Sequence, residues 1–187
     1  MEYKNQSLTK YLNDLAARLP APGGGSAAAL NAALAASLIS MVVNFTLGKP
    51  RYAAFMKELK AILVKSERLR KQFLDIVDLD IKAYQSKNIE KSLAVPLRLA
   101  VLCSQAAQLC LPLIKKGNIN LISDVAVAAV LLESALVAAC YNVEINLKSM
   151  ADNRCARKIK NELKQMQKRV LKIRKNTEDE VGKIIRR

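Results

Sequence analysis

Apolar side chains recur every three or four residues along almost the whole chain, and no stretch alternates convincingly between apolar and polar side chains. A spacing of three or four residues places side chains on one face of a helix, whereas strands require a period of two. The first helical stretch follows Ser7, a residue suited to cap a helix, and stops before Pro20 and Pro22. The pattern predicts an all-α protein of six or seven helices.

Two of the predicted helices are rich in alanine and apolar on nearly every side. One follows a glycine loop, with Ser26 as its expected cap, and runs to about Phe45, whereas the other runs from Leu121 to Val143. Both approach the length that spans a bilayer. Alanine inserts weakly into membranes, however, and polar or acidic side chains interrupt both segments. We therefore expect two buried central helices in a single compact domain over residues 1–187, and no membrane partner.

Prolines and a glycine divide the rest of the chain. Pro50 suits the first position of a helix, and apolar positions continue over residues 52–84 as one long helix or a kinked pair. Pro96 is expected to restart the helical pattern, Pro112 to kink it and Gly117 to end it.

The last segment, residues 151–187, keeps an apolar stripe at helical spacing and predicts a basic amphipathic helix. It holds 13 lysines and arginines against 5 acidic residues, a net charge of +8 within the +15 of the chain. Such a charge favours anionic partners. No stacking aromatic side chains are interleaved with the basic residues, so a nucleic-acid partner is disfavoured and a solvated helix face is the simpler interpretation.

The chain has no histidine, and its four cysteines, Cys103, Cys110, Cys140 and Cys155, lack a Cys-x-x-Cys spacing. A zinc site is therefore not expected, and any general acid or base must be Asp, Glu, Lys, Tyr or Cys. The cysteines are expected to be reduced core residues. The N-terminal sequence lacks the basic flank and apolar run of a signal peptide, so we expect a cytoplasmic protein.

Asp80 shares an apolar helical stripe with Phe73, Ile76, Val77 and Tyr84. A carboxylate in such a position is costly unless it has a partner or a use. Asp80 therefore either pairs with a neighbouring lysine or arginine at a helix end, or has a raised pKa suited to protonating a leaving group. The residues themselves leave both interpretations open.

Three other groups carry polar chemistry at helical positions. Asp124 follows Ser123 at a helix start, where the helix dipole favours an acid whatever its function. Asn142 and Asn146 lie four residues apart on one face, and they either lock neighbouring helices together or bind the amide-like edge of a heterocycle. The loop at residues 22–26 puts N–H groups at a helix N-terminus, which suits an anion but equally a plain turn. It lacks the lysine of a phosphate-binding P-loop and the preceding strand of a dinucleotide fold.

Four segments, in this order, resemble the formiminotetrahydrofolate cyclodeaminase family, which also includes methenyltetrahydrofolate cyclohydrolases. They are APGGGSAAALNAALAASLISMVVNFTLGK, DLDIKAY, GNINLISDVAVAA and ACYNVEINLKSMADN, and the resemblance covers residues from about 5 to 165. It implies an all-helical homodimer or larger ring that binds a tetrahydrofolate derivative and needs no metal or redox cofactor. It also implies that the polyglutamate tail of the folate gives the basic surface a use.

Carried over position by position, the resemblance implies catalytic roles for Asp80 and Asp124. Asp80 would transfer a proton at the leaving amine, and Asp124 would orient or stabilise the cationic amidine. The chain departs from the small residues usual around the first of these acids, because it has Leu79, Ile81 and Lys82 there. The positions that the resemblance assigns to substrate binding are Gly23, Gly24, Gly25, Ser26, Asn44, Thr46, Lys49, Tyr84, Ser123, Asn142 and Asn146.

The activity that the resemblance implies first is cyclodeamination of 5-formimino-tetrahydrofolate to 5,10-methenyl-tetrahydrofolate and ammonia. Hydrolysis of the methenyl compound to 10-formyl-tetrahydrofolate in the same pocket is the alternative reaction. A non-catalytic helical module that binds folate, and a nucleic-acid-binding protein led by the basic segment, are the alternatives from other classes.

Overall fold

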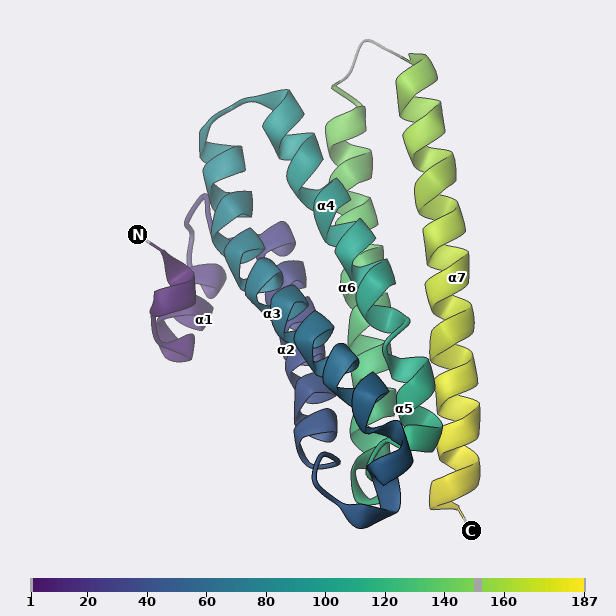
Figure 1. The fold of residues 1–187 in the computed structure, drawn as a ribbon. Coiled ribbons are helices and arrows are strands. Elements are labelled where there is room, and N and C mark those ends of the chain that lie inside the picture. Colours follow the sequence, from purple (N-terminus) through teal and green to yellow (C-terminus); the bar gives the residue numbers. More distant parts are fainter. Residues whose placement is uncertain (1, 150–152, 187) are drawn as a thin grey trace.

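The structure, a computed structural model, describes residues 2–149 and 153–186, which form a bundle of seven α-helices (Figure 1). These residues contain no strand, so the predicted all-α class is confirmed. The α-helices are α1 (Leu8–Ala16), α2 (Gly24–Asn44), α3 (Met56–Gln85), α4 (Ile89–Ala107), α5 (Cys110–Lys116), α6 (Ile122–Leu147) and α7 (Asn153–Ile185). There are also three short 3₁₀ helices: η1 (Tyr3–Asn5) before α1, η2 (Pro50–Phe55) between α2 and α3, and η3 (Ile119–Leu121) between α5 and α6.

The long helices run side by side along the bundle, and in the view of Figure 1 α3 lies in front of α2 and α4 in front of α6. Helix α2 packs mainly against α3 and α6, and α6 also packs against α4 and α7. Helix α7 follows the outer edge, and α1 stands outside the bundle near the N-terminal end of the chain (Figure 1). The start of α2 and the ends of α3 and α6 therefore meet at one end of the molecule.

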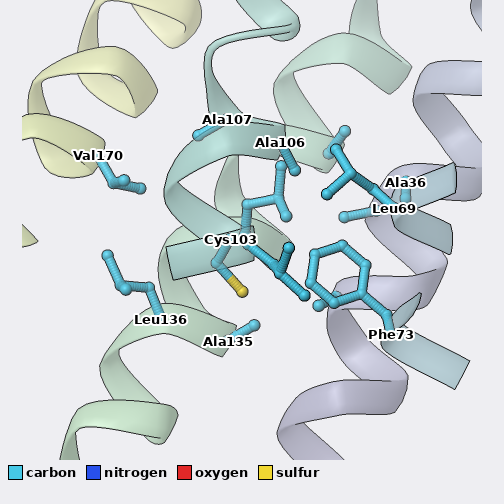
Figure 2. Packing of buried hydrophobic residues seen from close by; sticks show 14 of the residues in the cluster. Ala36, Leu69, Phe73, Cys103, Ala106, Ala107, Ala135, Leu136 and Val170 are labelled. Atoms are coloured by element: carbon cyan, nitrogen blue, oxygen red, sulfur yellow. The ribbon is translucent and has the colours of Figure 1, made fainter. Parts of the chain in front are cut away.

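The core is built from small and branched side chains of all the long helices. Figure 2 shows Phe73 of α3, Cys103 of α4, Leu136 of α6 and Val170 of α7 converging on one another. Alanines at many of the buried positions in α2 and α6 allow the helices to approach closely, which is the packing that the composition predicted. Three cysteines are buried as expected, but Cys155 is exposed and therefore does not belong to the core.

The helix starts agree only partly with the predicted caps. Ser7 caps α1, because its Oγ accepts the Lys10 N–H at 3.2 Å. Ser26 does not cap α2, which begins at Gly24 without a side-chain cap. The buried Ser26 hydroxyl instead contacts the hydroxyl of Tyr11 at 3.1 Å.

Pro96 does not start a helix, as the sequence had suggested, but lies inside α4. The helix begins earlier because the Asn88 side chain caps it by accepting the Lys91 N–H at 2.9 Å. Proline has no N–H, so it leaves the carbonyl four residues before it without its helical donor. The Asn146 side chain of α6 supplies a donor to that carbonyl, on Ser92, at 2.6 Å.

The other predicted boundaries are largely correct. Residues 56–85 form one continuous helix, preceded by the 3₁₀ turn that Pro50 opens. Pro112 lies in the separate short helix α5 rather than at a kink, and Gly117 follows the last residue of that helix. In α7, Leu163 and Val170 are buried while the lysines are mostly exposed, which confirms an amphipathic helix over Asn153–Ile185. Residues 151, 152 and 187 of the predicted segment lie outside the described residues.

The two alanine-rich helices, α2 and α6, are not buried on every side. By length and composition, three segments are apolar enough to cross a membrane: Gly24–Asn44, Ile89–Lys116 and Ile119–Leu147. In the bundle, 61% of the apolar window of the first is buried, but only 39% of that of the last. Leu34 of α2 and Val130 of α6 are 54% and 41% exposed. An apolar side of α2 and α6 is therefore left uncovered by the described chain.

Candidate functional site

A cavity of about 380 Å³ lies at the end of the bundle where α2 begins and α3 and α6 end. It brings together residues from the glycine loop, the acidic motif and the paired asparagines, which are far apart in the sequence. Its walls are Pro20, Ala21, Gly23, Gly24, Asp80, Ile81, Ala83, Tyr84, Ser92, Asn142, Ile145 and Asn146.

The carboxyl group of Asp80 is the ionisable group best placed to transfer a proton in this cavity. Burial raises the pKa of Asp80, and a backbone hydrogen bond from Ser26 opposes that rise. In the described part of the chain no lysine or arginine pairs with Asp80. The nearby Lys82 instead pairs with Glu2, with 3.2 Å between Nζ and Oε1. The structural interpretation of Asp80 as half of an ion pair is therefore wrong. A carboxyl group with a raised pKa can hold a proton for a reaction near neutral pH.

Gly25 allows the Asp80 side chain to approach the first turn of α2. A Cβ atom at position 25 would lie 2.2 Å from Oδ1 and 2.6 Å from Cγ of Asp80, closer than any non-bonded contact allows. Gly25 thus leaves the space that the Asp80 carboxyl group occupies, and the backbone N–H of Ser26 faces that carboxyl group at the start of α2. The structure places Gly25 beside Asp80 rather than in the cavity wall.

A second set of contacts ties the N-terminal segment to the same place. The Asp78 carboxylate accepts the Tyr3 N–H at 2.6 Å, and the Tyr3 ring packs edge-on against Tyr11 with centroids 5.5 Å apart. Tyr11, the only buried residue of α1, reaches Ser26. The sequence predicted Tyr11 only as one apolar position of an amphipathic helix, and nothing in its spacing distinguishes it from its leucine neighbours.

The two asparagines line the cavity but are also held by the protein. Asn142 donates its side-chain N–H to the carbonyl of Ala138, one turn earlier in α6, at 2.9 Å. Asn146 donates to Ser92 of α4 and so links two helices as well as facing the cavity. The interpretation that these residues link neighbouring helices holds for Asn146, and the binding of a heterocycle stays a prediction. Tyr84 lies at the mouth of the cavity, with 59% of its surface exposed.

The remaining predicted site residues lie at the other end of the bundle. They are Asn44, Thr46, Lys49, Ser123 and Asp124. At 1.5 Å per residue, the length of α2 separates Gly24 from Asn44 by about 30 Å, and α6 separates Asp124 from Asn142 by about 27 Å.

The structure describes the surroundings of four of these residues. Thr46 is buried and structural, because its hydroxyl donates to Val42 at 2.6 Å and accepts the Asn118 N–H at 2.8 Å. Ser123 and Lys49 are exposed, and Asp124 lies in the first turn of α6, as the helix dipole favours. The two predicted catalytic carboxylates therefore do not meet within one chain.

The site thus defined is a small acid and amide cavity in a helical bundle, the kind of concave site that holds a small polar molecule. The family model described as formiminotransferase-cyclodeaminase matches residues 7–89 and 86–165. Because this match covers most of the sequence, the chain belongs to the formiminotransferase-cyclodeaminase family.

Known proteins show the same likeness in sequence and in structure. A methenyltetrahydrofolate cyclohydrolase from Methylorubrum extorquens is 33% identical over an alignment of 171 residues, and the match covers 79% of this chain and 82% of that protein. A formimidoyltransferase-cyclodeaminase from Rattus norvegicus is 32% identical over 170 residues, but the match covers only 31% of that longer protein. The crystal structure of formiminotetrahydrofolate cyclodeaminase from Thermotoga maritima aligns with a TM-score of 0.93 at 26% identity, over 98% of this chain and 100% of that one.

Proposed function

We propose that this protein is an enzyme of folate one-carbon chemistry that converts 5-formimino-tetrahydrofolate into 5,10-methenyl-tetrahydrofolate and ammonia. The observation that carries the proposal is the Asp80 carboxyl group, which has a raised pKa and no cationic partner in the described chain and lines a cavity beside two asparagine amides. The names of the relatives in the family support a folate substrate.

The reaction requires one proton transfer in a fixed geometry. N10 attacks the carbon of the protonated formimino group on N5, so a C–N10 bond forms. The bond from that carbon to the terminal nitrogen then breaks, and the N10 proton moves to the departing nitrogen, which leaves as ammonia. Holding N10 near the carbon lowers the entropic cost of attack, and a carboxyl group that accepts and returns the proton lowers the barrier further.

The residues of the cavity divide these tasks. Asp80 accepts the N10 proton as a carboxylate and returns it to the leaving nitrogen. Asn142 and Asn146 hold the polar edge of the pterin ring, and the backbone of Gly23 and Gly24 shapes the cavity wall near the reacting atoms. No atom changes oxidation state, so we propose that the reaction uses no redox cofactor.

The second candidate is the cyclohydrolase reaction in the same cavity. Water adds to the methenyl carbon, the bond to N5 breaks, and 10-formyl-tetrahydrofolate and a proton are released. Asp80 would then take the proton of the attacking water. The similarity to the Methylorubrum cyclohydrolase favours this candidate, because most of that protein is covered by the match.

The test mixes the protein separately with 5-formimino-tetrahydrofolate and with 5,10-methenyl-tetrahydrofolate and follows the absorbance band of the methenyl compound. A rise with release of ammonia in the first mixture supports the cyclodeaminase. A loss faster than the protein-free control in the second supports the cyclohydrolase. No difference from the control in either mixture contradicts an enzyme and favours a folate-binding module.

We also propose that the protein acts as a homodimer through the uncovered side of α2 and α6. Exposed apolar side chains of α6, among them Val127, Val130, Tyr141 and Ile145, are spaced by 3, 11 and 4 residues and so lie on one face. A second copy offers the same face, which is what a two-fold interface requires. A two-fold axis perpendicular to the helices would place the Asp124 end of one copy beside the Asp80 end of the other, and would unite the two sets of predicted residues.

The oligomeric state can be measured directly. Val130→Glu puts a charge on the proposed interface and should convert a dimer into a monomer in light scattering after size exclusion. Val64→Glu is the matched control, because Val64 is 71% exposed on α3, away from that face. A wild-type monomer, or binding of the wild-type protein to lipid vesicles through this face, would contradict the homodimer.

The other expected partners follow from the folate proposal. A polyglutamate tail would approach the basic helix α7 from the cavity end, where α7 begins next to the end of α6 (Figure 1).

We propose a cytoplasmic location, where such folates and reduced cysteines occur together.

A further inference from the structure

The N-terminal segment of the chain, residues 2–16, is held to the bundle by residues 2–4, which contact α3, and by Tyr11 of α1. Leu8 and Leu12 of α1 are 63% and 50% exposed, so their apolar side chains are not what fixes the helix. The only buried residue of α1 is Tyr11, which is 4% exposed. The buried contact of α1 therefore leads to Ser26 in the first turn of α2.

The contacts of this segment form a network that begins and ends on α3, near Asp80. It begins at Asp78 of α3, whose carboxylate accepts the Tyr3 N–H at 2.6 Å. It continues through the edge-on contact of the Tyr3 and Tyr11 rings, 5.5 Å apart at 85°. The Tyr11 hydroxyl then meets the Ser26 hydroxyl at 3.1 Å, and the Ser26 backbone returns to α3 by its hydrogen bond to Asp80.

Ser26 is the residue through which this network contacts the Asp80 carboxyl group. Its side chain is completely buried, so it does not reach a ligand directly. The missing Cβ of Gly25 lets Asp80 come close to the first turn of α2, but space alone does not determine where that turn lies. The Tyr11 hydroxyl supplies the restraint, because it fixes the Ser26 side chain and with it the backbone N–H that faces the carboxylate.

We propose that Tyr11 is a positioning residue, which acts through Ser26 to hold the Asp80 carboxyl group against the start of α2. The proposal rests on the proposed function of Asp80 and extends the site to the N-terminal segment. Loss of the Tyr11 hydroxyl should leave the cavity intact and loosen only the hydrogen bond from Ser26 to Asp80.

The groups around Asp80 make its titration a specific readout. From α1 the facing ionisable group is Tyr11, and from α3 it is Tyr84, one turn further on. The neighbours Asp78 and Lys82 are engaged by Tyr3 and Glu2. The residues of α2 and α6 that line the cavity carry no ionisable side chain. A hydrogen bond to a carboxylate lowers its pKa, so weakening the Ser26 bond should raise the pKa of Asp80 further.

The test compares the wild-type protein with Tyr11→Phe, which removes one oxygen atom. We expect kcat to fall on the order of 10-fold, KM to stay within about twofold, and the pKa of Asp80 in the pH profile to move upward. Ser26→Ala should give the same changes, and the double variant should be no worse than either single variant, because both changes interrupt one path.

Tyr52→Phe serves as the matched control. It also removes a buried hydroxyl, one that accepts the Ile119 N–H at 3.1 Å near the opposite end of the bundle. This variant should leave the pH profile in place, even where thermal stability falls.

The outcomes separate this proposal from the proposed function. An active wild-type enzyme in which Tyr11→Phe changes neither kcat nor the pH profile overturns the positioning role. An inactive wild-type protein contradicts the proposed folate reaction but not the positioning role. The carboxyl carbon of Asp80 can then be titrated by NMR in the wild-type protein and in Tyr11→Phe. An upward shift in Tyr11→Phe still supports the positioning role, and an unchanged titration overturns it.

Discussion

The Cα hydrogen of Gly25 points at the Asp80 carboxyl group, and a Cβ in its place would lie 2.2 Å from Oδ1. The two residues come from α2 and α3, so a change of one methyl group on one helix must displace the acid on the other. Stability and activity should therefore respond differently to the same substitution.

Gly25→Ala is expected to lower kcat/KM at least about 100-fold, because a displacement of the order of 1 Å at a reacting group has that effect. Alanine favours a helix over glycine by about 1 kcal/mol, which offsets the local displacement, so the melting temperature should change little. Activity assays and thermal unfolding measure the two effects. Gly182→Ala is the control, because the nearest atom to an added Cβ there is 3.6 Å away on a flexible arginine. Equal losses of activity in both variants would contradict the role of Gly25.

Asp80→Asn should abolish most of the activity, by about 100- to 10,000-fold, because proton transfer by a side chain contributes that much. At neutral pH the same substitution should increase the stability of the folded protein. Burial raises the pKa of Asp80 in the folded state, so ionisation disfavours folding once the pH passes the unfolded pKa, and fully so above the folded pKa. Below the unfolded pKa both states are protonated, and the contribution vanishes.

The measurement is chemical denaturation of both proteins across pH. Asp80→Asn should gain stability relative to wild type as the pH rises from acid to neutral. A gain that does not depend on pH, or a loss at neutral pH, would contradict the desolvated carboxyl group.

Asn146 and Pro96 should be coupled through the carbonyl of Ser92. Asn146→Ala leaves this half-buried carbonyl without its donor, which should cost about 1–3 kcal/mol of unfolding free energy. In a Pro96→Ala background, residue 96 regains an N–H that can reach the same carbonyl, so the cost of Asn146→Ala should shrink. Urea denaturation of the four proteins of this double-mutant cycle gives the coupling energy. Additive effects would show that the Asn146 bond does not replace the missing helical one.

The proposed dimer makes a prediction about mixed subunits. If the Asp124 of one copy completes the cavity of the other, Asp80→Asn and Asp124→Asn should each be inactive alone. When they are co-expressed, mixed dimers contain one cavity with both acids, so about a quarter of the wild-type activity should return. The rate in the cyclodeaminase or cyclohydrolase assay measures the recovery.

A control mixture of Asp80→Asn with Gly25→Ala should recover nothing, because every cavity in it keeps one defect. Absence of recovery in the first mixture, or full activity of Asp124→Asn alone, would contradict a cavity shared between copies.

The sequence predicted the helical class and most helix boundaries because these depend on local spacing. Ser7 as a cap and the stripe of α7 are examples, since both follow from residues within a few positions of one another. Pro96 shows the limit. A proline inside a helix is normally excluded, and only the distant Asn146 makes it acceptable, so local rules placed a helix start where none exists.

The site was predictable to a similar extent. Asp80 stood out because an acid interrupted an apolar stripe, and the cavity confirms that it lies beside Asn142 and Asn146. Tyr11 could not be distinguished, because its role depends on a hydroxyl group meeting a helix that is fifteen residues away in the sequence. The separation of Asp124 from Asp80 was also hidden, since it depends on the lengths and directions of two helices.

The hydrogen bonds of the two asparagines determine which partner the cavity can recognise. Each side-chain amide already donates one N–H to a backbone carbonyl, Ala138 for Asn142 and Ser92 for Asn146, and this fixes which way the amide is turned. The amide oxygen and the second N–H of each asparagine are then left for a guest molecule, so each side chain can accept one hydrogen bond and donate another. We expect this wall of the cavity to suit the amide-like edge of a heterocycle, where a donor and an acceptor lie side by side, better than a ring that presents only lone pairs.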